Sequence, residues 1–152
     1  MENIEKLNEI VELFQKEDQS EGVKYEKINL FESIFDKISQ KEREHFISSF
    51  PVDIFNKIIL LLEHSNFYNF ATKILCVACS DFSILKRYSS FTDLSFITTS
   101  LSRIFSELKD SYEGEDIVNR IMLIVGNIIL FSHEDEECFE AIHAASCCFN
   151  LP

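Results

Sequence analysis

Apolar residues recur every three to four positions over most of this chain, the spacing that places them on one face of a helix. The first such stretch, with Ile4, Leu7 and Ile10, is typical of the whole chain. No segment alternates apolar and polar residues over the length of a strand. The pattern therefore predicts an all-α protein with helices at residues 4–14, 25–38, 41–50, 52–64, 67–79, 82–90, 92–108, 116–131 and 135–145.

Residues that start or stop helices mark several of these boundaries. Gly22 is interpreted as a stop signal at the end of a polar linker, residues 16–22. Pro51 suits the first turn of a helix, where its missing N–H costs nothing. Asn66 and Asp81 can cap the helices that follow them by accepting hydrogen bonds from backbone N–H groups.

Two stretches of the chain repeat each other. The tetrapeptide SSFP at 48–51 returns as SSFT at 89–92, an offset of 41, and residues 73–80 return as residues 120–127, an offset of 47. The six extra residues fit in the polar run 109–116. A period of roughly 40–47 residues built only of helices is typical of armadillo and HEAT solenoids. We expect a single domain, a right-handed armadillo-like α-solenoid, with two full three-helix repeats at 41–80 and 81–132 and partial repeats at 1–40 and 133–152.

One segment resembles the armadillo family in more detail. The sequence IVNRIMLIVGNIIL at 117–130, followed by DEECFEAI at 135–142, resembles the third helix of an armadillo repeat and the first helix of the next. Gly126 and Asn127 match the small residue and the asparagine that such families carry near the end of the third helix. The resemblance implies that Asn127 lies on a concave groove and hydrogen-bonds the backbone of an extended ligand.

The chain departs from the family at other positions. A ligand-stacking tryptophan usually stands four residues before the asparagine, and here that position is Leu123. In the earlier repeat the tryptophan and asparagine positions are Cys76 and Ser80. The glycine usual between the first and second helices is missing.

Lys73 and Arg120 occupy equivalent positions in the two repeats, one turn before Cys76 and Leu123. On a solenoid, equivalent positions lie on one wall. Two stacked cations predict either a small basic strip that meets an acidic or phosphorylated peptide, or ordinary salt bridges to neighbouring carboxylates.

Composition and charge narrow the possible partners. The chain has 152 residues, 46% of them hydrophobic, with only three glycines and two prolines, which favours long helices with short connections. Its formal net charge is −12 and its isoelectric point is about 4.7. This balance argues against direct binding of nucleic acid and of anionic membranes, because both need cationic protein surfaces. It indicates either a basic partner or simple solubility.

The N-terminal sequence and the number of cysteines indicate the cellular compartment. Residues 1–15 form an acidic amphipathic stretch rather than the basic and apolar regions of a secretory signal. The apolar run 121–131 is interrupted by Asn127 and is too short to span a bilayer. Five cysteines are an odd number and form no small disulfide framework. We therefore expect the reducing environment of the cytosol or the nucleus.

Candidate catalytic and metal-binding groups are few. Cys76 and Cys79 have the spacing of half a zinc site, but they lie in an apolar helix and are better interpreted as buried small residues. His143 with Cys147-Cys148 could supply further ligands, although adjacent cysteines point apart on a helix. No glycine-rich phosphate loop exists. We expect no cofactor, no metal and no enzymatic activity; a polar pocket at His45 or His64 would reopen that question.

The pattern predicts a non-catalytic interaction module, an adaptor or scaffold that binds a partner protein or peptide. The alternative is a compact Bcl-2-like helical bundle that takes an amphipathic helix in a groove. The candidate binding residues along the concave face are Lys73, Cys76, Ser80, Arg120, Leu123 and Asn127.

The C-terminal end is a second candidate interface. Phe139 and Phe149 are among several apolar residues there that no following helix would cover, and exposed apolar patches usually mark interfaces. The end could bind a partner or a second copy in a homo-oligomer, or the tail could fold back and seal the last repeat.

Overall fold

The computed structural model describes residues 2–13, 21–89 and 94–132. Within these ranges the chain forms eight α-helices, two single 3-10 turns and no strand, which confirms the all-α class. The ninth predicted helix, at 135–145, lies outside the described residues. The helices are α1 Glu2–Leu13, α2 Glu21–Phe35, α3 Gln40–Ser48, α4 Val52–Leu60, α5 Tyr68–Ser80, α6 Phe82–Ser89, α7 Leu94–Leu108 and α8 Glu115–Ser132, and the 3-10 turns are Leu61–Glu63 and Ser65–Phe67.

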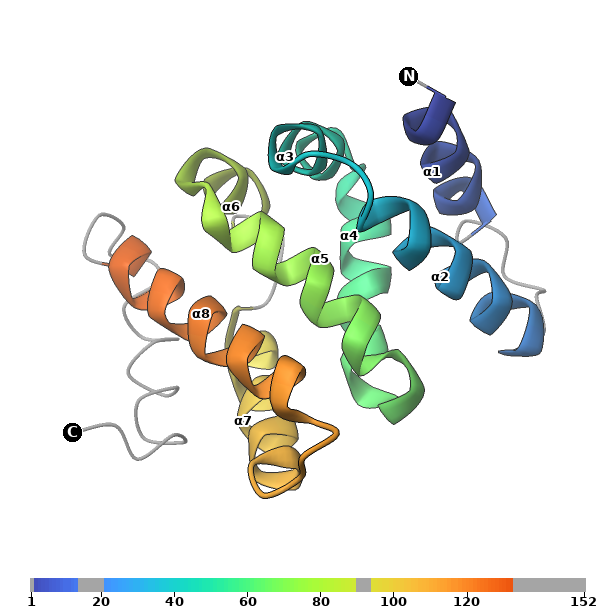
Figure 1. The fold of residues 1–152 in the computed structure, drawn as a ribbon. Coiled ribbons are helices and arrows are strands. Elements are labelled where there is room, and N and C mark those ends of the chain that lie inside the picture. The colour runs from blue at the N-terminus through green and yellow to red at the C-terminus, as the bar shows by residue number, and fades with distance from the viewer. Residues whose placement is uncertain (1, 14–20, 90–93, 133–152) are drawn as a thin grey trace.

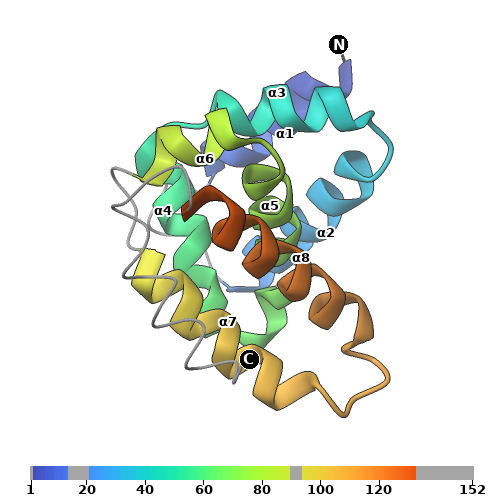
Figure 2. The same ribbon diagram turned by 90° about the vertical axis from the view of Figure 1, so that its left-hand side faces the viewer.

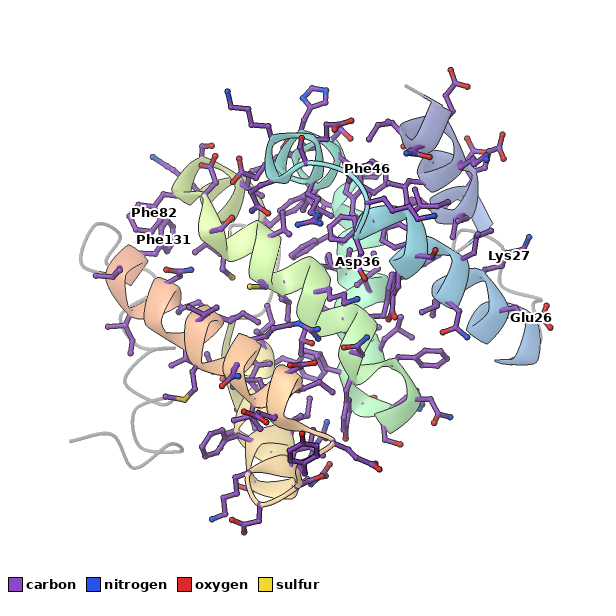
Figure 3. All side chains as sticks on the ribbon, in the orientation of Figure 1. Glu26, Lys27, Asp36, Phe46, Phe82 and Phe131 are labelled. Carbon is purple, nitrogen blue, oxygen red and sulfur yellow. The ribbon has the colours of Figure 1, made fainter. Side chains whose placement is uncertain are left out.

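Three helices, α2, α5 and α8, lie side by side and run in the same direction (Figure 1). Helices α4 and α7 lie behind them, and α3 and α6 lie at the end where α2 and α5 finish; Figure 2 shows the same order from the side. Helix α5 is central, because it packs against α8, α3, α6 and α4. Phe82 of α6 meets Phe131 of α8 at a ring-centroid distance of 5.9 Å (Figure 3).

Phenylalanine rings join α2, α3 and α5 in the core. The Phe31 ring lies 5.5 Å from Phe35 and 5.8 Å from Phe46, centroid to centroid. Phe31 also meets Phe70 edge-on at 5.1 Å, and Phe46 meets Phe50 at 4.8 Å. Such pairs contribute about 0.5–1.5 kcal/mol each beyond the burial of their area. The aromatic cluster therefore fixes how α2 and α3 sit against α5.

Tyr88 of α6 closes the end of α3. Its hydroxyl lies 2.6 Å from the carbonyl oxygen of Ile47 and 2.8 Å from that of Phe50, and it donates to this pair of acceptors. Its ring stacks on Phe55 at 4.0 Å. The last carbonyls of a helix lack their usual partners within the helix, and Tyr88 here adds a buried donor to two carbonyls that also accept from the Phe50 N–H and from Arg87.

Several helices begin where the sequence supplies a cap. Ser39 and Glu42 form a reciprocal capping box at the start of α3, with both hydrogen bonds at 3.2 Å. Pro51 directly precedes α4 and occupies its cap position. Asp81 accepts a hydrogen bond from the Ser83 N–H at 2.8 Å, which confirms the predicted cap of α6.

Three predicted boundaries are wrong. Gly22 lies inside the first turn of α2 and does not stop a helix. Helix α4 ends at Leu60 and does not reach His64, because the chain tightens there into the two 3-10 turns. Asn66 lies within the second 3-10 turn, and no side chain caps α5. These boundaries depend on local turn geometry, which cannot be predicted from hydrophobic periodicity.

The longest described helix is α8, with 18 residues. No single helix in the described ranges is long and apolar enough to cross a membrane. Helix α3 and residues Val52–Glu63 would reach that length and hydropathy together, but across a bend of 108°.

Candidate functional site

Four of the six predicted concave-face residues line one hollow of about 260 Å³ between α2, α3, α5 and α8, here called the basic groove. Leu123 and Asn127, the other two, lie on α8 outside its lining; Leu123 is 60% exposed. Phe139 and Phe149 lie outside the described residues. The basic groove is lined by Phe35, Asp36, Gln40, Arg43, Lys73, Cys76, Val77, Ser80 and Arg120.

Helix α5 forms the floor of the basic groove because it has two unlike faces. Ile74, Leu75 and Ala78 are fully buried against the neighbouring helices. Lys73 and Ser80, spaced two turns apart on the opposite side, are half-buried and exposed respectively. The 3.6-residue period of the sequence thus decides which side chains reach the hollow.

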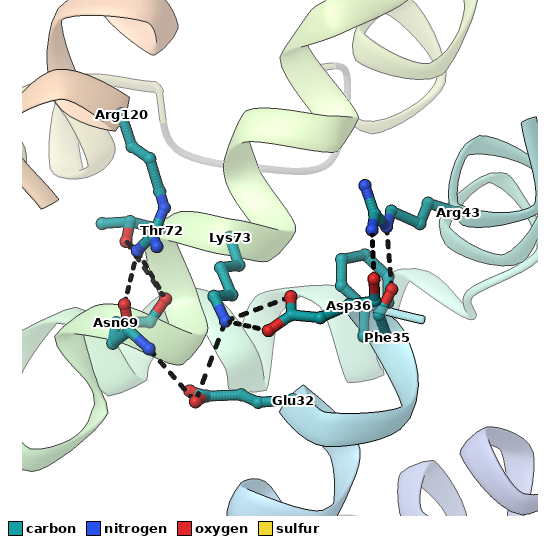
Figure 4. A network of polar contacts seen from close by, with 8 residues as sticks. All are labelled: Glu32, Phe35, Asp36, Arg43, Asn69, Thr72, Lys73 and Arg120. Carbon is teal, nitrogen blue, oxygen red and sulfur yellow. Dashed lines mark hydrogen bonds and ion pairs between the residues drawn. The ribbon is translucent and has the colours of Figure 1, made fainter. Parts of the chain in front are cut away.

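Lys73 is engaged in salt bridges from α5 to α2 (Figure 4). Its Nζ lies 2.9 Å from Asp36 Oδ2 and 4.0 Å from Glu32 Oε2. The lysine side chain is 16% exposed, whereas that of Asp36 is 58% exposed. Of the two interpretations of Lys73, a basic strip or ordinary salt bridges to neighbouring carboxylates, the contacts of this lysine are salt bridges.

Arg120, the equivalent residue on α8, has neutral partners instead. Its Nη1 donates to Asn69 Oδ1 at 2.5 Å and also lies 3.3 Å from Thr72 Oγ1 and 3.4 Å from the Asn69 carbonyl oxygen. Among the residues that the structure describes, its Nε and Nη2 donors have no partner and no carboxylate pairs with it. Arg120 thus keeps both its charge and unused N–H groups beside the hollow.

Asn69 connects the two cations. Its Nδ2 donates to Glu32 Oε2 at 3.1 Å while its Oδ1 accepts from Arg120. The chain from Glu32 through Asn69 to Arg120 ties α2, α5 and α8 together (Figure 4). Nothing in the sequence pattern singles out Asn69, because its role depends on helices that lie far apart along the chain.

Arg43 of α3 is the third cation of the basic groove, and sequence reasoning missed it. Its Nε donates to the Phe35 carbonyl at 2.8 Å and its Nη2 to the Asp36 carbonyl at 2.9 Å (Figure 4). Its guanidinium also lies 5.5 Å from the centre of the Phe35 ring. These contacts satisfy carbonyls at the C-terminal end of α2, where a cation is favourable to the helix dipole.

The charge of the basic groove is opposite to that of the chain. Its lining contains three cations, Arg43, Lys73 and Arg120, and a single carboxylate, Asp36. The whole chain has 14 lysines and arginines against 26 acidic residues. A concave site with an excess of one charge attracts ligands of the other sign.

The cysteines and histidines offer less chemistry. Burial raises the pKa of the Cys76 thiol, an effect that the nearby Arg120 charge partly offsets, and burial raises the pKa of Cys79 to about 12. Both thiols are free. In the described part of the chain, no three His, Cys, Asp or Glu side chains gather as metal ligands. His45 and His64 are exposed, and neither lines the basic groove or the second hollow, near residues 108–118.

No family model, no curated protein and no solved structure matches the chain. What the molecule binds is therefore inferred from its own residues.

Proposed function

We propose that the protein is an armadillo-like α-solenoid that binds an extended segment of a partner protein along the exposed face of α2, α5 and α8. Helix starts support the repeat. Helices α3 and α6 begin 42 residues apart, as do α4 and α7, and α5 and α8 begin 47 residues apart. These offsets are close to the sequence offsets of 41 and 47, and this agreement supports a repeat of three helices.

The observation that carries the binding proposal is a ladder of outward-facing positions. The same offset of 47 relates Lys73, Cys76 and Ser80 of α5 to residues on α8 and also to residues on α2. All nine side chains are exposed or half-buried. Most residues on the opposite, inner faces of these helices are buried. The ladder consists of Glu26, Asn29 and Ser33 on α2, Lys73, Cys76 and Ser80 on α5, and Arg120, Leu123 and Asn127 on α8.

The character of this face suits an extended peptide better than an amphipathic helix. Helix-in-groove recognition needs an apolar groove, and six of the nine residues that line this hollow are charged or polar. Ser33, Ser80 and Asn127 supply hydroxyl and amide groups at intervals along the ladder, and such groups can pair with a peptide backbone. The proposal includes no catalytic step and no cofactor. Free Cys76 and Cys79 agree with a role in the cytosol or nucleus.

A double variant on the ladder tests this function. Leu123→Ala with Asn127→Ala should reduce capture of peptides from a randomised library about tenfold, because apolar contact and a backbone hydrogen bond are lost together. Both side chains reach the surface, so the melting temperature should change little.

The matched control is Leu60→Ala with Tyr112→Ala, which removes two exposed apolar side chains, 54% and 90% exposed, from outside the ladder. It should leave capture unchanged. Equal loss of capture in the two double variants would refute the assignment of the ladder as the binding face.

A further inference from the structure

We propose that the basic groove binds one phosphorylated side chain of the extended partner segment, and that Asp36 occupies part of this site in the free protein. The inference rests on the proposed function, because the ladder would hold the peptide on either side of the phosphate. The phosphate contacts would come from Arg120, Lys73 and Arg43.

The first support is that three helices supply the cations independently. Lys73 lies on α5, Arg120 on α8 and Arg43 on α3, and they are distant in the sequence but line the same hollow (Figure 4). The lining as a whole has a formal charge of +2, and Glu32, outside the lining but 4.0 Å from Lys73, lowers the local sum to +1. A phosphomonoester carries about −1.5 to −2 at neutral pH, which complements this charge.

The second support is the hydrogen-bonding capacity that the site leaves unused. The Nε and Nη2 groups of Arg120 have no partner among the described residues. Guanidinium N–H groups match phosphate oxygens in pairs, which gives the strongest class of charge-assisted hydrogen bond. Asn69 and Thr72 hold the Arg120 Nη1 group in place, so the side chain is already oriented before a ligand arrives.

The third support is the arrangement of Lys73 and Asp36. The ammonium is mostly covered, while its carboxylate partner is 58% exposed. An ion pair with so exposed a partner is weak, so a more highly charged group can replace the carboxylate. Asp36 would then turn outward, and its backbone carbonyl would stay hydrogen-bonded to Arg43.

The net charge of the protein also limits the partner. A segment with many carboxylates or phosphates would be repelled by the body of a chain of net charge −12. A single phosphate with neutral or basic flanking residues satisfies both the basic groove and the acidic surface around it. The partner class is therefore a singly phosphorylated, otherwise neutral or basic peptide.

The test uses randomised nonapeptide libraries with a fixed central phosphoserine, serine or aspartate, captured on the full chain. The wild-type protein should retain the phosphoserine library at least tenfold better than the other two. Arg120→Gln and Lys73→Gln should each weaken that retention about tenfold. Asp36→Asn, which removes the competing carboxylate, should strengthen it about threefold to fivefold.

Lys57→Gln is the matched control, because Lys57 is also a half-buried lysine but lies on α4, behind α5. It should not change retention. If Arg120→Gln lowers the melting temperature, its loss of retention could come from unfolding. The stronger retention expected of Asp36→Asn cannot come from unfolding, so that variant still tests the proposal.

The outcomes separate this inference from the proposed function. Equal retention of all three libraries, lost in the Leu123→Ala with Asn127→Ala variant, would refute the phosphate site and support the peptide face. Equal retention of aspartate and phosphoserine would also refute it, as would inorganic phosphate binding as tightly as the phosphopeptides. Failure of a folded wild-type protein to retain any library would refute both.

Discussion

At the scale of single residues, each of the four arginines in this chain donates to a main-chain carbonyl elsewhere in the protein. Arg43 reaches the end of α2, and Arg120 reaches Asn69. Arg87 donates to the Phe50 carbonyl at 3.0 Å, and Arg103 donates to the Leu62 carbonyl at 2.7 Å. Three of the four thereby satisfy carbonyls at the ends of helices or in the turns after them, which have no partner within the helix. In so acidic a chain, arginines thus connect helices more than they neutralise carboxylates.

Tyr88 performs the same task with a neutral group, and its titration should be visible at high pH. Burial raises its pKa to about 12, from a usual value of 10. Between these values the unfolded chain has lost the proton and the folded protein keeps it. The stability that Tyr88 contributes is therefore complete below about pH 10 and is lost as the pH rises through about 12. Urea unfolding from pH 8 to pH 12 measures this decline.

Tyr88→Phe should lower the free energy of unfolding at pH 8 by about 0.5–1.5 kcal/mol, because the hydrogen bond of the hydroxyl is lost while the Ile47 and Phe50 carbonyls keep their other donors, the Phe50 N–H and Arg87. It should also make the decline above pH 10 shallower, leaving the part due to the other groups whose pKa burial raises, Tyr68, Cys76 and Cys79. Tyr112→Phe, at a position 90% exposed, should change neither quantity. An unaltered slope in Tyr88→Phe would show that Tyr88 does not control the alkaline response.

At the scale of helices, Gly114 and Gly126 have opposite roles. Gly114 precedes α8, and a Cβ there would lie 2.8 Å from Leu108 Cβ, closer than real contacts allow. Gly126 lies in the middle of α8, where a Cβ would meet nothing within 4 Å. The first glycine permits a tight turn between α7 and α8, while the second only weakens a helix.

Alanine substitutions should separate these roles. Gly114→Ala should destabilise the protein by about 1–3 kcal/mol, because either the turn or Leu108 must move. Gly126→Ala should stabilise it by about 0.5–1 kcal/mol, since alanine loses less backbone entropy in a helix. Urea denaturation midpoints measure both changes. A stabilising Gly114→Ala would contradict the close approach of α7 to α8.

Helix-scale comparison also shows what the sequence can reveal. The type and approximate position of every described helix could be predicted, because each buries one face and repeats its apolar residues accordingly. The cap at Asp81 could be predicted from the sequence, because an acidic residue precedes an apolar run. The end of α4 at Leu60 was not, because 3-10 and α-helical turns bury similar residues there.

At the scale of the whole molecule, the repeat offset of 47 was enough to pair Lys73 with Arg120. It could not supply their partners, because Asp36 lies 37 residues before Lys73 and Asn69 lies 51 residues before Arg120. The role of Arg43 in the basic groove could not be predicted for the same reason, because it depends on the turn that brings α3 back to the end of α2. Contacts between helices thus decide the chemistry of the site, whereas periodicity within helices decides only which residues are available for it.

The most direct test of the central claim is to map a bound peptide on the protein by NMR. A peptide selected by the wild-type chain would be titrated into uniformly ¹⁵N-labelled protein, and the shift of each backbone amide recorded. The account predicts that the largest shifts fall along α2, α5 and α8, near the ladder positions Asn29, Cys76 and Leu123. Shifts concentrated on α4 and α7, with those three helices unchanged, would contradict it.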